Sequence, residues 1–516
     1  MTHDPDGVDG SHAVSATPPA TAGGPRKRGF GGAVKWALVM KWGQYGSAAL
    51  VQFVLMALLD VEDFGVVGMA WLYIAFIEMV LDQGFGAAII QRKNLEQRHL
   101  ESVFWLVLAV ALGLTGVSVL LSGWWAAANH DPRIAAVIQV MSLRIPIQGL
   151  TTVQVALLQR SMDFRSLAVR NMSSVVVGGV IGISLALLGY GVWSLVAQQL
   201  SMALIALVLL WTVSGWRPGF RFSGKAMREL LGFSTGTFVA KVGVFVANKA
   251  DEILVGLFFG TFAVGVYRSA MRLMSLVVEL GSRAIGVAAF PKFAQAQDDP
   301  ATLRRDLSFC FWLSSLLVIP GLALLAGVSD SLMATLGGKW LPAADVLKVL
   351  CLVGVAQSLT TFQAPMLQGT GRSTLFAGVV WGTAALSSGA FVVAGFVGRA
   401  EPESVQPLFI AWGRGGLYLG VFLPMSYCIL RWLSGYSIAE LMRAIRGPLT
   451  AGVAIFLGVR GLVWAGWGAS WPPVVQLLVQ GVFGVALGAG ILLATDPLLR
   501  DKAGLLRAKL GLGGSR

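Results

Sequence analysis

The sequence predicts an all-α integral membrane protein of about 14 transmembrane helices, arranged as two pseudo-symmetric six-helix lobes plus two C-terminal helices. Three observations lead to this fold class. Apolar residues make up 56% of the 516 residues, charged residues only 13%, and the mean hydropathy is +0.73. Long apolar runs follow one another with short loops between them, which leaves no room for a soluble domain. One segment of the fourth run is repeated in the tenth.

The apolar runs are each long enough to cross a bilayer of about 30 Å. They cover, to within a few residues at each end, about 36–59, 64–90, 102–128, 134–157, 171–190, 192–213, 232–258, 262–290, 306–328, 343–367, 374–398, 406–430, 447–468 and 473–495.

The basic residues predict the orientation of these spans. With the N-terminus in the cytoplasm, the cytoplasmic tails and loops receive 25 of the 39 Lys and Arg residues, and the external loops receive only Arg133, Lys339 and Arg399. This excess on one side follows the positive-inside rule, so both termini are expected in the cytoplasm. The same rule accounts for the net charge of +13, which is spread over many loops and does not indicate a nucleic-acid partner.

The spans divide the chain into five parts. These are a disordered cytoplasmic N-terminal tail (1–31), an N-lobe of spans one to six (32–213), a C-lobe of spans seven to twelve (214–433), two further spans (434–499) and a cytoplasmic C-terminal tail (500–516). The first apolar run begins too late for a signal peptide and is long enough to span the membrane.

An internal repeat relates the two lobes. The segment from Gln148 to Gln159 matches the segment from Gln357 to Gln368 at seven of twelve positions, including the sequence Leu-Thr-Thr in both. The two copies are six spans apart, an even number, so they cross the membrane in the same direction. Such parallel repeats are typical of transporters that work by alternating access, with the substrate site where the lobes meet.

Several phrases of the sequence resemble a known family. They are Asp63-Phe-Gly-Val-Val, Asp82-Gln-Gly-Phe-Gly, Met162-Asp-Phe-Arg, Leu188-Gly-Tyr-Gly-Val-Trp and Asn248-Lys-Ala-Asp followed by Gly265-Val-Tyr. Together and in this order, over roughly residues 33–430, they look like the Wzx-type flippases. These form the polysaccharide transporter branch of the multidrug/oligosaccharidyl-lipid/polysaccharide exporter superfamily, and the similarity is greatest to the colanic-acid-exporter-like subgroup. The resemblance implies a MATE-like two-lobed fold in the bacterial cytoplasmic membrane. It also implies export of undecaprenyl-pyrophosphate-linked oligosaccharide for exopolysaccharide or O-antigen synthesis, alongside a polysaccharide polymerase and other assembly proteins.

Charged side chains inside the spans are candidates for function, because each costs on the order of 2.5–3.5 kcal/mol near the bilayer centre. In span eight, Arg268, Arg272, Glu279 and Arg283 fall within about 60° of one another on an ideal helix. A stripe this narrow is expected to face a hydrated interior. The candidates for binding the substrate phosphates are Arg268, Arg272, Lys41, Arg144 and Lys241, because cationic side chains, and the arginine fork above all, suit phosphate oxygens. The alternative is that these cations pair with nearby acids or extend to the membrane surface. For another intramembrane arginine, Arg414, the interpretation is that its side chain extends to the membrane surface.

Two energy sources remain open. The first is the membrane potential. A pyrophosphate group with about two negative charges gains roughly 4–5 kcal/mol when it moves outward across a potential of 100 mV, inside negative. Alternatively, H⁺ or Na⁺ could bind the intramembrane acids Glu78, Asp82, Asp251 and Glu279 and return the empty carrier. The sequence contains no glycine-rich phosphate-binding loop, so direct use of ATP is not expected. Its scattered Cys and His residues form no metal-binding pattern, so no cofactor or metal is expected either.

The sequence is also compared with what three other functions would require. A cation-coupled small-molecule exporter of the MATE type would need an acidic cavity for organic cations, which the intramembrane arginines and lysines disfavour. A membrane enzyme, either a polymerase or a ligase, is expected to need a larger external loop than the one near residues 329–342, so the chain is expected not to be an enzyme. A scaffold of polysaccharide assembly remains open.

Overall fold

The N-terminal half of the chain forms a bundle of helices. The computed structural model describes residues 30–82, 85–92, 95–220, 223, 234–496 and 499, and it contains no strand among them. The helices of the N-lobe are α1 (Phe30–Leu58), α2 (Val61–Leu81), α3 (Phe85–Gln91), α4 (Gln97–Ala128), α5 (Arg133–Met141), α6 (Arg144–Arg160), α7 (Phe164–Leu187) and α8 (Val192–Val213). Within this lobe α7 packs between α1 and α8, and α6 packs against α4 and α8.

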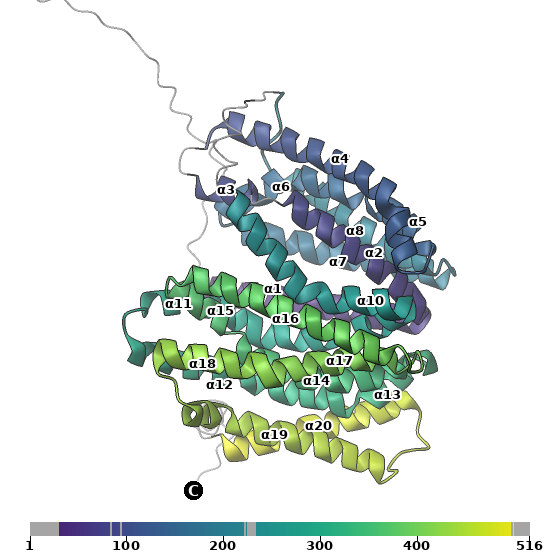
Figure 1. Cartoon of the computed structure of the whole chain (residues 1–516), viewed down its shortest axis with the longest axis vertical. Coiled ribbons are helices and arrows are strands. Elements are labelled where there is room, and N and C mark those ends of the chain that lie inside the picture. The colour runs from purple at the N-terminus through teal and green to yellow at the C-terminus, as the bar shows by residue number, and fades with distance from the viewer. Residues whose placement is uncertain are drawn as a thin grey trace, which may run out of the picture.

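The C-terminal half forms a second bundle. Its elements are α10 (Ser234–Val278), the π-helix η1 (Glu279–Arg283), α11 (Ala284–Gln295), α12 (Pro300–Gly327), α13 (Ser329–Leu336), the 3₁₀ turn η2 (Gly338–Trp340), α14 (Pro342–Thr360), α15 (Gln363–Gly369), α16 (Ser373–Gly398), α17 (Gln406–Leu417), the π-helix η3 (Tyr418–Phe422) and α18 (Leu423–Ser434). The last two helices, α19 (Ile438–Trp464) and α20 (Pro473–Thr495), pack together and lie against α12 and α13. Figure 1 shows the N-lobe above the C-lobe, with α19 and α20 at the far edge of the C-lobe.

Twelve of the described helices are long and apolar enough to cross a membrane. One of them, Lys241–Gln295, has 55 residues and is broken at Gly260, whose φ of 79° a residue with a side chain rarely adopts. At about 1.5 Å per residue this helix would be more than twice as long as a bilayer is thick, so it is long enough to cross twice. The predicted class, an all-helical multi-pass membrane protein, is confirmed, while the total of fourteen spans stays a prediction. Of the predicted tails (1–31 and 500–516), residues 1–29 and 500–516 lie outside the described residues, while residues 30 and 31 already belong to α1.

Local sequence signals set the helix ends. Asp299 accepts hydrogen bonds from the backbone of Ala301 and Thr302, and Pro300 follows it at the first turn of α12. Ser437 and Glu440 bond each other's backbone at the start of α19. These caps satisfy amide groups that the first turn of a helix leaves without partners.

The two lobes meet where α2 crosses the second half of α10. The backbones approach so closely that a Cβ atom on Gly65 would lie 1.8 Å from the carbonyl oxygen of Thr261. In the reciprocal contact, a Cβ atom on Gly265 would lie 2.1 Å from the carbonyl oxygen of Val61. We call these four residues the glycine crossing. Only glycine fits at either position, because a side chain would overlap the facing backbone.

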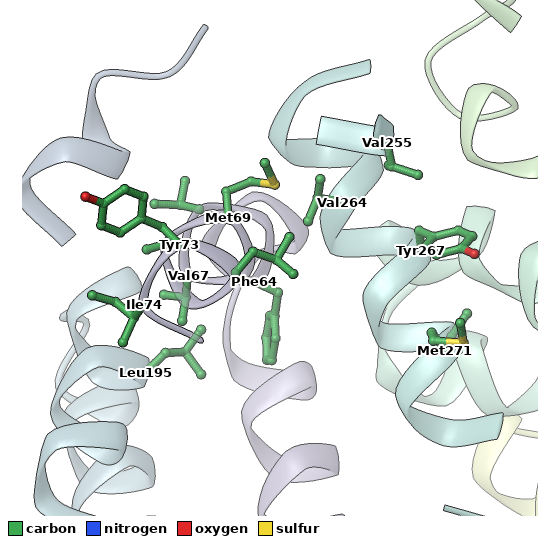
Figure 2. Close-up of a cluster of buried hydrophobic side chains, with 14 of the residues drawn as sticks. Phe64, Val67, Met69, Tyr73, Ile74, Leu195, Val255, Val264, Tyr267 and Met271 are labelled. Atoms are coloured by element: carbon green, nitrogen blue, oxygen red, sulfur yellow. The ribbon is translucent and has the colours of Figure 1, made fainter. Parts of the chain in front are cut away.

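Apolar side chains fill the space around this crossing. Figure 2 shows α2 between two helices, with Ile74 near Leu195 of α8 on one side and Met69 extending towards Val264 of α10 on the other. All four side chains are at least nine-tenths buried. The crossing therefore lies in the middle of a packed core that both lobes share.

Polar contacts join the lobes at the same end of the bundle as the glycine crossing. The indole of Trp340 donates to the carbonyl of Met56 (2.7 Å), and Lys339 pairs with Asp60 (3.0 Å). The hydroxyl of Thr261 lies 3.3 Å from a carboxylate oxygen of Asp131. Burial raises the pKa of Asp131, but hydrogen bonds from Arg133 outweigh it and hold the pKa below its usual value, so this carboxylate stays charged at neutral pH. Since Lys339 and Arg133 are predicted to be external, the closed end is the predicted external one.

Candidate functional site

The N-lobe contains a cavity of about 530 Å³ whose lining includes charged and polar side chains. Five helices of the lobe and the start of α10 surround it. Its lining residues are Glu78, Leu81, Asp82, Gly86, Ile90, Arg144, Ile147, Gln148, Thr151, Thr152, Val155, Ala156, Gln159, Arg170, Ala203, Ala206 and Lys241. The first copy of the sequence repeat therefore forms one wall, through Gln148, Thr151, Thr152 and Gln159. We call this space the N-lobe cavity.

Arg144 is held in this cavity by several contacts. Its Nε donates to Oε1 of Glu78 (3.2 Å), and its guanidinium carbon lies 4.6 Å from the ring centroid of Trp71. The amide of Gln148, turned so that it donates, lies 3.2 Å from Oε2 of Glu78. Arg144 is also bonded to the carbonyl of Gln199 (3.2 Å). The predicted phosphate ligand Arg144 and the predicted ion ligand Glu78 thus form one pair, in which the carboxylate fixes the arginine.

The mouth of the cavity carries two further cations. Nζ of Lys241 lies 2.8 Å from a carboxylate oxygen of Asp82, so α10 is linked there to the end of α2. Arg170 lines the same cavity, and its guanidinium bonds the side chain of Asn171 (2.7 Å) rather than a carboxylate. With three cations and two acids, the lining has an excess of positive charge. Arg170 lies one residue before the predicted fifth span (171–190) and is not among the predicted site residues, whereas the structure places it in the second turn of α7.

The C-lobe contains a smaller cavity of about 190 Å³. Its lining residues are Ala247, Asn248, Thr360, Gln363, Ala364, Phe376, Val379, Val380, Thr383, Ser387, Phe391, Arg414, Leu417, Tyr418, Phe422 and Met425. Thr360 and Gln363 belong to the second copy of the repeat, which begins in α14 and continues in α15. We call this space the C-lobe cavity. Each copy of the repeat thus lines a cavity in its own lobe.

A buried ion pair borders the C-lobe cavity. The guanidinium of Arg414 on α17 bonds the carboxylate of Asp251 on α10, which also accepts a hydrogen bond from the hydroxyl of Tyr267 (2.7 Å). Arg414 is 4% exposed and Asp251 is 1% exposed. The interpretation that Arg414 extends to the membrane surface was therefore wrong, because burial of Asp251 requires a neutralising partner and Arg414 supplies it.

Asp251→Asn is expected to destabilise the folded protein by about 3–5 kcal/mol, because it leaves Arg414 buried without a counter-charge. The measurement is thermal unfolding of the purified protein in detergent. The double variant Asp251→Asn/Arg414→Gln should lose less than the two single changes added together. A fully additive loss would show that the two side chains do not act as a pair.

The residues of the stripe predicted on span eight lie in different surroundings in the structure. Arg268 lies against the N-lobe, where its guanidinium donates to the carbonyl of Gly68 (2.9 Å) and pairs with Glu252 (3.4 Å). The π-helix η1 begins at Glu279 and changes the register, and Glu279 pairs there with Arg283 (3.1 Å). Only the first two members of the stripe therefore remain on one regular helical face.

Arg272 is the cation best placed to meet a ligand. It is exposed and, within the described part of the chain, has neither a hydrogen bond nor an ion pair. It lies one turn beyond Arg268, which touches α2, so the two share the face of α10 that looks towards the N-lobe. Arg272 is about 18 Å along the helix from the break at Gly260, near the middle of a membrane core of about 30 Å. An unpaired charge at this depth points to a hydrated space between the lobes.

The remaining predicted site residues fall into two groups. Lys41 lies in α1, and its side chain is outside the part of the structure that is described. The four candidate ion ligands each have a cationic partner: Glu78 with Arg144, Asp82 with Lys241, Asp251 with Arg414 and Glu279 with Arg283. Among the predicted site residues that the structure describes, the carboxylates are paired and the guanidinium of Arg272 is not, which suits an anionic ligand better than a cation.

Known structures share this architecture. The lipid II flippase MurJ in an inward closed conformation matches with a TM-score of 0.68 at 12% identity, over 90% of this chain and 99% of that chain. An inward-facing multidrug resistance MATE family transporter of the MOP superfamily matches with a TM-score of 0.56 at 16% identity, over 76% of this chain and 96% of that one. The chain therefore has the all-helical, MATE-like fold of this class of structure, as predicted.

The sequence comparisons narrow this class. The chain belongs to the polysaccharide biosynthesis protein family, whose model matches residues 54–345. It is 29% identical over 480 residues to the succinoglycan biosynthesis transport protein ExoT of Rhizobium meliloti, covering 92% of this chain and 95% of that protein. It is also similar to the lipopolysaccharide biosynthesis protein WzxC of Escherichia coli, at 23% identity over 65% of this chain and 68% of that protein.

Proposed function

We propose that this protein is an alternating-access flippase that exports a lipid-linked oligosaccharide, carried on undecaprenyl pyrophosphate, for synthesis of a surface polysaccharide. The observation that carries the proposal is Arg272, an exposed and unpaired arginine on the face of α10 that looks towards the N-lobe. Its guanidinium binds the pyrophosphate by two parallel hydrogen bonds. The positive lining of the N-lobe cavity adds Arg144, Arg170 and Lys241. The names of ExoT and WzxC support a glycan cargo.

The protein lies in the bacterial cytoplasmic membrane with both termini in the cytoplasm. In this orientation the glycine crossing and the Lys339–Asp60 pair close the external end. The N-lobe cavity reaches Asp82 and Lys241. These residues lie at the ends of α2 and of the first half of α10 that are far from this crossing, so the substrate enters from the cytoplasm. The domains that move are the N-lobe (32–213) and the C-lobe (214–433), with 434–499 attached to the second. Polysaccharide polymerases and other assembly proteins act on the exported product.

The membrane potential supplies the energy for export. The pairing of Glu78, Asp82, Asp251 and Glu279 with arginine or lysine supports this over H⁺ or Na⁺ coupling. We expect the flipping rate in proteoliposomes to rise as the compartment holding the substrate is made more negative. Exchanging Na⁺ for K⁺ on both sides should leave it unchanged. A rate that follows the Na⁺ gradient or the pH gradient at zero potential would instead assign coupling to these carboxylates.

Organic cations are disfavoured as substrates, because the three cations of the N-lobe cavity outnumber its two acids.

The decisive experiment uses proteoliposomes containing a fluorescent undecaprenyl-pyrophosphate oligosaccharide and a reagent that destroys only externally exposed fluorophores. Protein-dependent loss of the protected fraction supports a flippase. Loss at the rate of empty liposomes would overturn the proposal and leave a scaffold role. Release of free sugar or pyrophosphate would instead indicate an enzyme.

A further inference from the structure

Three polar atoms in or beside the C-lobe cavity have no partner among the residues that the structure describes. Nε2 of Gln363, Nε of Arg414 and Oδ1 of Asp251 are buried and unbonded. Gln363 is 7% exposed and lines the cavity. Buried polar groups are nearly always satisfied by protein, water or ligand, so these atoms indicate that a polar molecule occupies the space.

The charge of the cavity excludes most classes of ligand. Arg414 is its one charged lining residue, and Asp251 beside it neutralises that charge. A phosphate would find no free cation, and a metal ion or organic cation would meet the guanidinium next to the carboxylate. The occupant is therefore uncharged and rich in hydrogen-bonding groups.

The lining has the composition that suits a sugar ring. The hydroxyls of Thr360, Thr383 and Ser387 donate to carbonyls of their own helices, which leaves their oxygens free to accept. The amide of Gln363 and the phenol of Tyr418 add groups that can donate. The rings of Phe376, Phe391 and Phe422 supply flat apolar surface for the C–H faces of a sugar. At about 30 Å³ per water molecule, the volume of about 190 Å³ corresponds to roughly six waters, which is room for one sugar ring.

We propose that the C-lobe cavity binds a neutral sugar unit of the oligosaccharide, while the cationic groups of Arg272 and the N-lobe cavity hold the pyrophosphate. This inference rests on the proposed function and adds to it a division of the substrate between two lobes. The two copies of the repeat then have different roles, since the first lines a cavity with excess positive charge and the second a neutral one. Because such a substrate contacts both lobes at once, binding of the glycan influences the movement of one lobe relative to the other.

The test uses the double variant Gln363→Met/Thr383→Val, which keeps the side-chain volumes and removes a donor and an acceptor from the cavity. Calorimetry on the purified full-length protein measures binding of two soluble probes. One is the free oligosaccharide released from the lipid-linked intermediate of the source cells, and the other is inorganic pyrophosphate. We expect the double variant to weaken oligosaccharide binding about 10-fold without changing pyrophosphate binding, and Arg272→Gln to do the reverse.

The matched control is Thr115→Val on α4. The Thr115 hydroxyl also donates to a carbonyl of its own helix (2.8 Å), but it lines neither cavity. This variant should bind both probes as the unchanged protein does. The inference is overturned if the double variant binds the oligosaccharide normally, or if it loses affinity for both probes equally. An unchanged protein that binds pyrophosphate but no oligosaccharide refutes this inference alone, whereas one that binds neither refutes the proposed function as well.

Discussion

Arg272→Gln is expected to reduce flipping of the lipid-linked oligosaccharide by about 10- to 100-fold, the loss that follows when a hydrogen bond to a charged group is removed. Arg272 has no other partner among the described residues, so its replacement removes a contact with the substrate and breaks none with those residues. Arg272→Lys keeps the charge but loses the planar fork, so its flipping rate should lie between that of the unchanged protein and that of Arg272→Gln. The measurement is the fluorophore-protection assay in proteoliposomes.

The matched control for this variant is Arg283→Gln. Arg283 is also exposed and belongs to the same sequence stripe, but it lies in η1 and pairs with Glu279. Its replacement should change the rate by less than about fivefold, because exposed ion pairs contribute only about 0–1 kcal/mol. Equal losses in the two variants would show that general positive charge, and not Arg272, is what the substrate needs.

Gly65→Leu is expected to prevent closure of the external end and to abolish transport. Even the first side-chain atom would lie 1.8 Å from the carbonyl oxygen of Thr261, an overlap that only separation of α2 from α10 can relieve. The protein would then be held with its external end open. Gly113→Leu on α4 is the control, because a Cβ atom there has nothing within 4 Å.

Access to the crossing can be measured with a cysteine reporter. Val264→Cys, introduced after replacement of Cys310, Cys351 and Cys428, places a thiol at a position that is 1% exposed beside the crossing. A membrane-impermeant maleimide added outside should label it slowly in the unchanged background and rapidly with Gly65→Leu. Slow labelling together with normal transport would contradict the assignment of the glycine crossing as the external closure.

The helical membrane-spanning architecture could be predicted from the sequence, because hydropathy and loop charge are local properties of the chain. A run of apolar residues predicts a span without knowledge of its neighbours, and the two copies of the repeat identify equivalent walls in the two lobes. The ion pairs could not be predicted in this way. Asp251 and Arg414 are 163 residues apart, and only the packing of α17 on α10 brings them together. The stripe on span eight failed beyond Arg272 for another reason, since it assumed 3.6 residues per turn where η1 is a π-helix.

The reciprocal contacts of the glycine crossing have the form of a symmetric dimer interface. In a two-fold homodimer, if one residue touches a second, the second touches the first in the partner subunit. Here Gly65 meets Thr261 and Gly265 meets Val61, each pair being a glycine and a residue four positions before the other glycine. The single chain thus contains the contact that two copies of one six-helix unit would make about a shared axis. The symmetry of the repeat is therefore present in the backbone contact between the lobes, even though the linings of the two cavities differ.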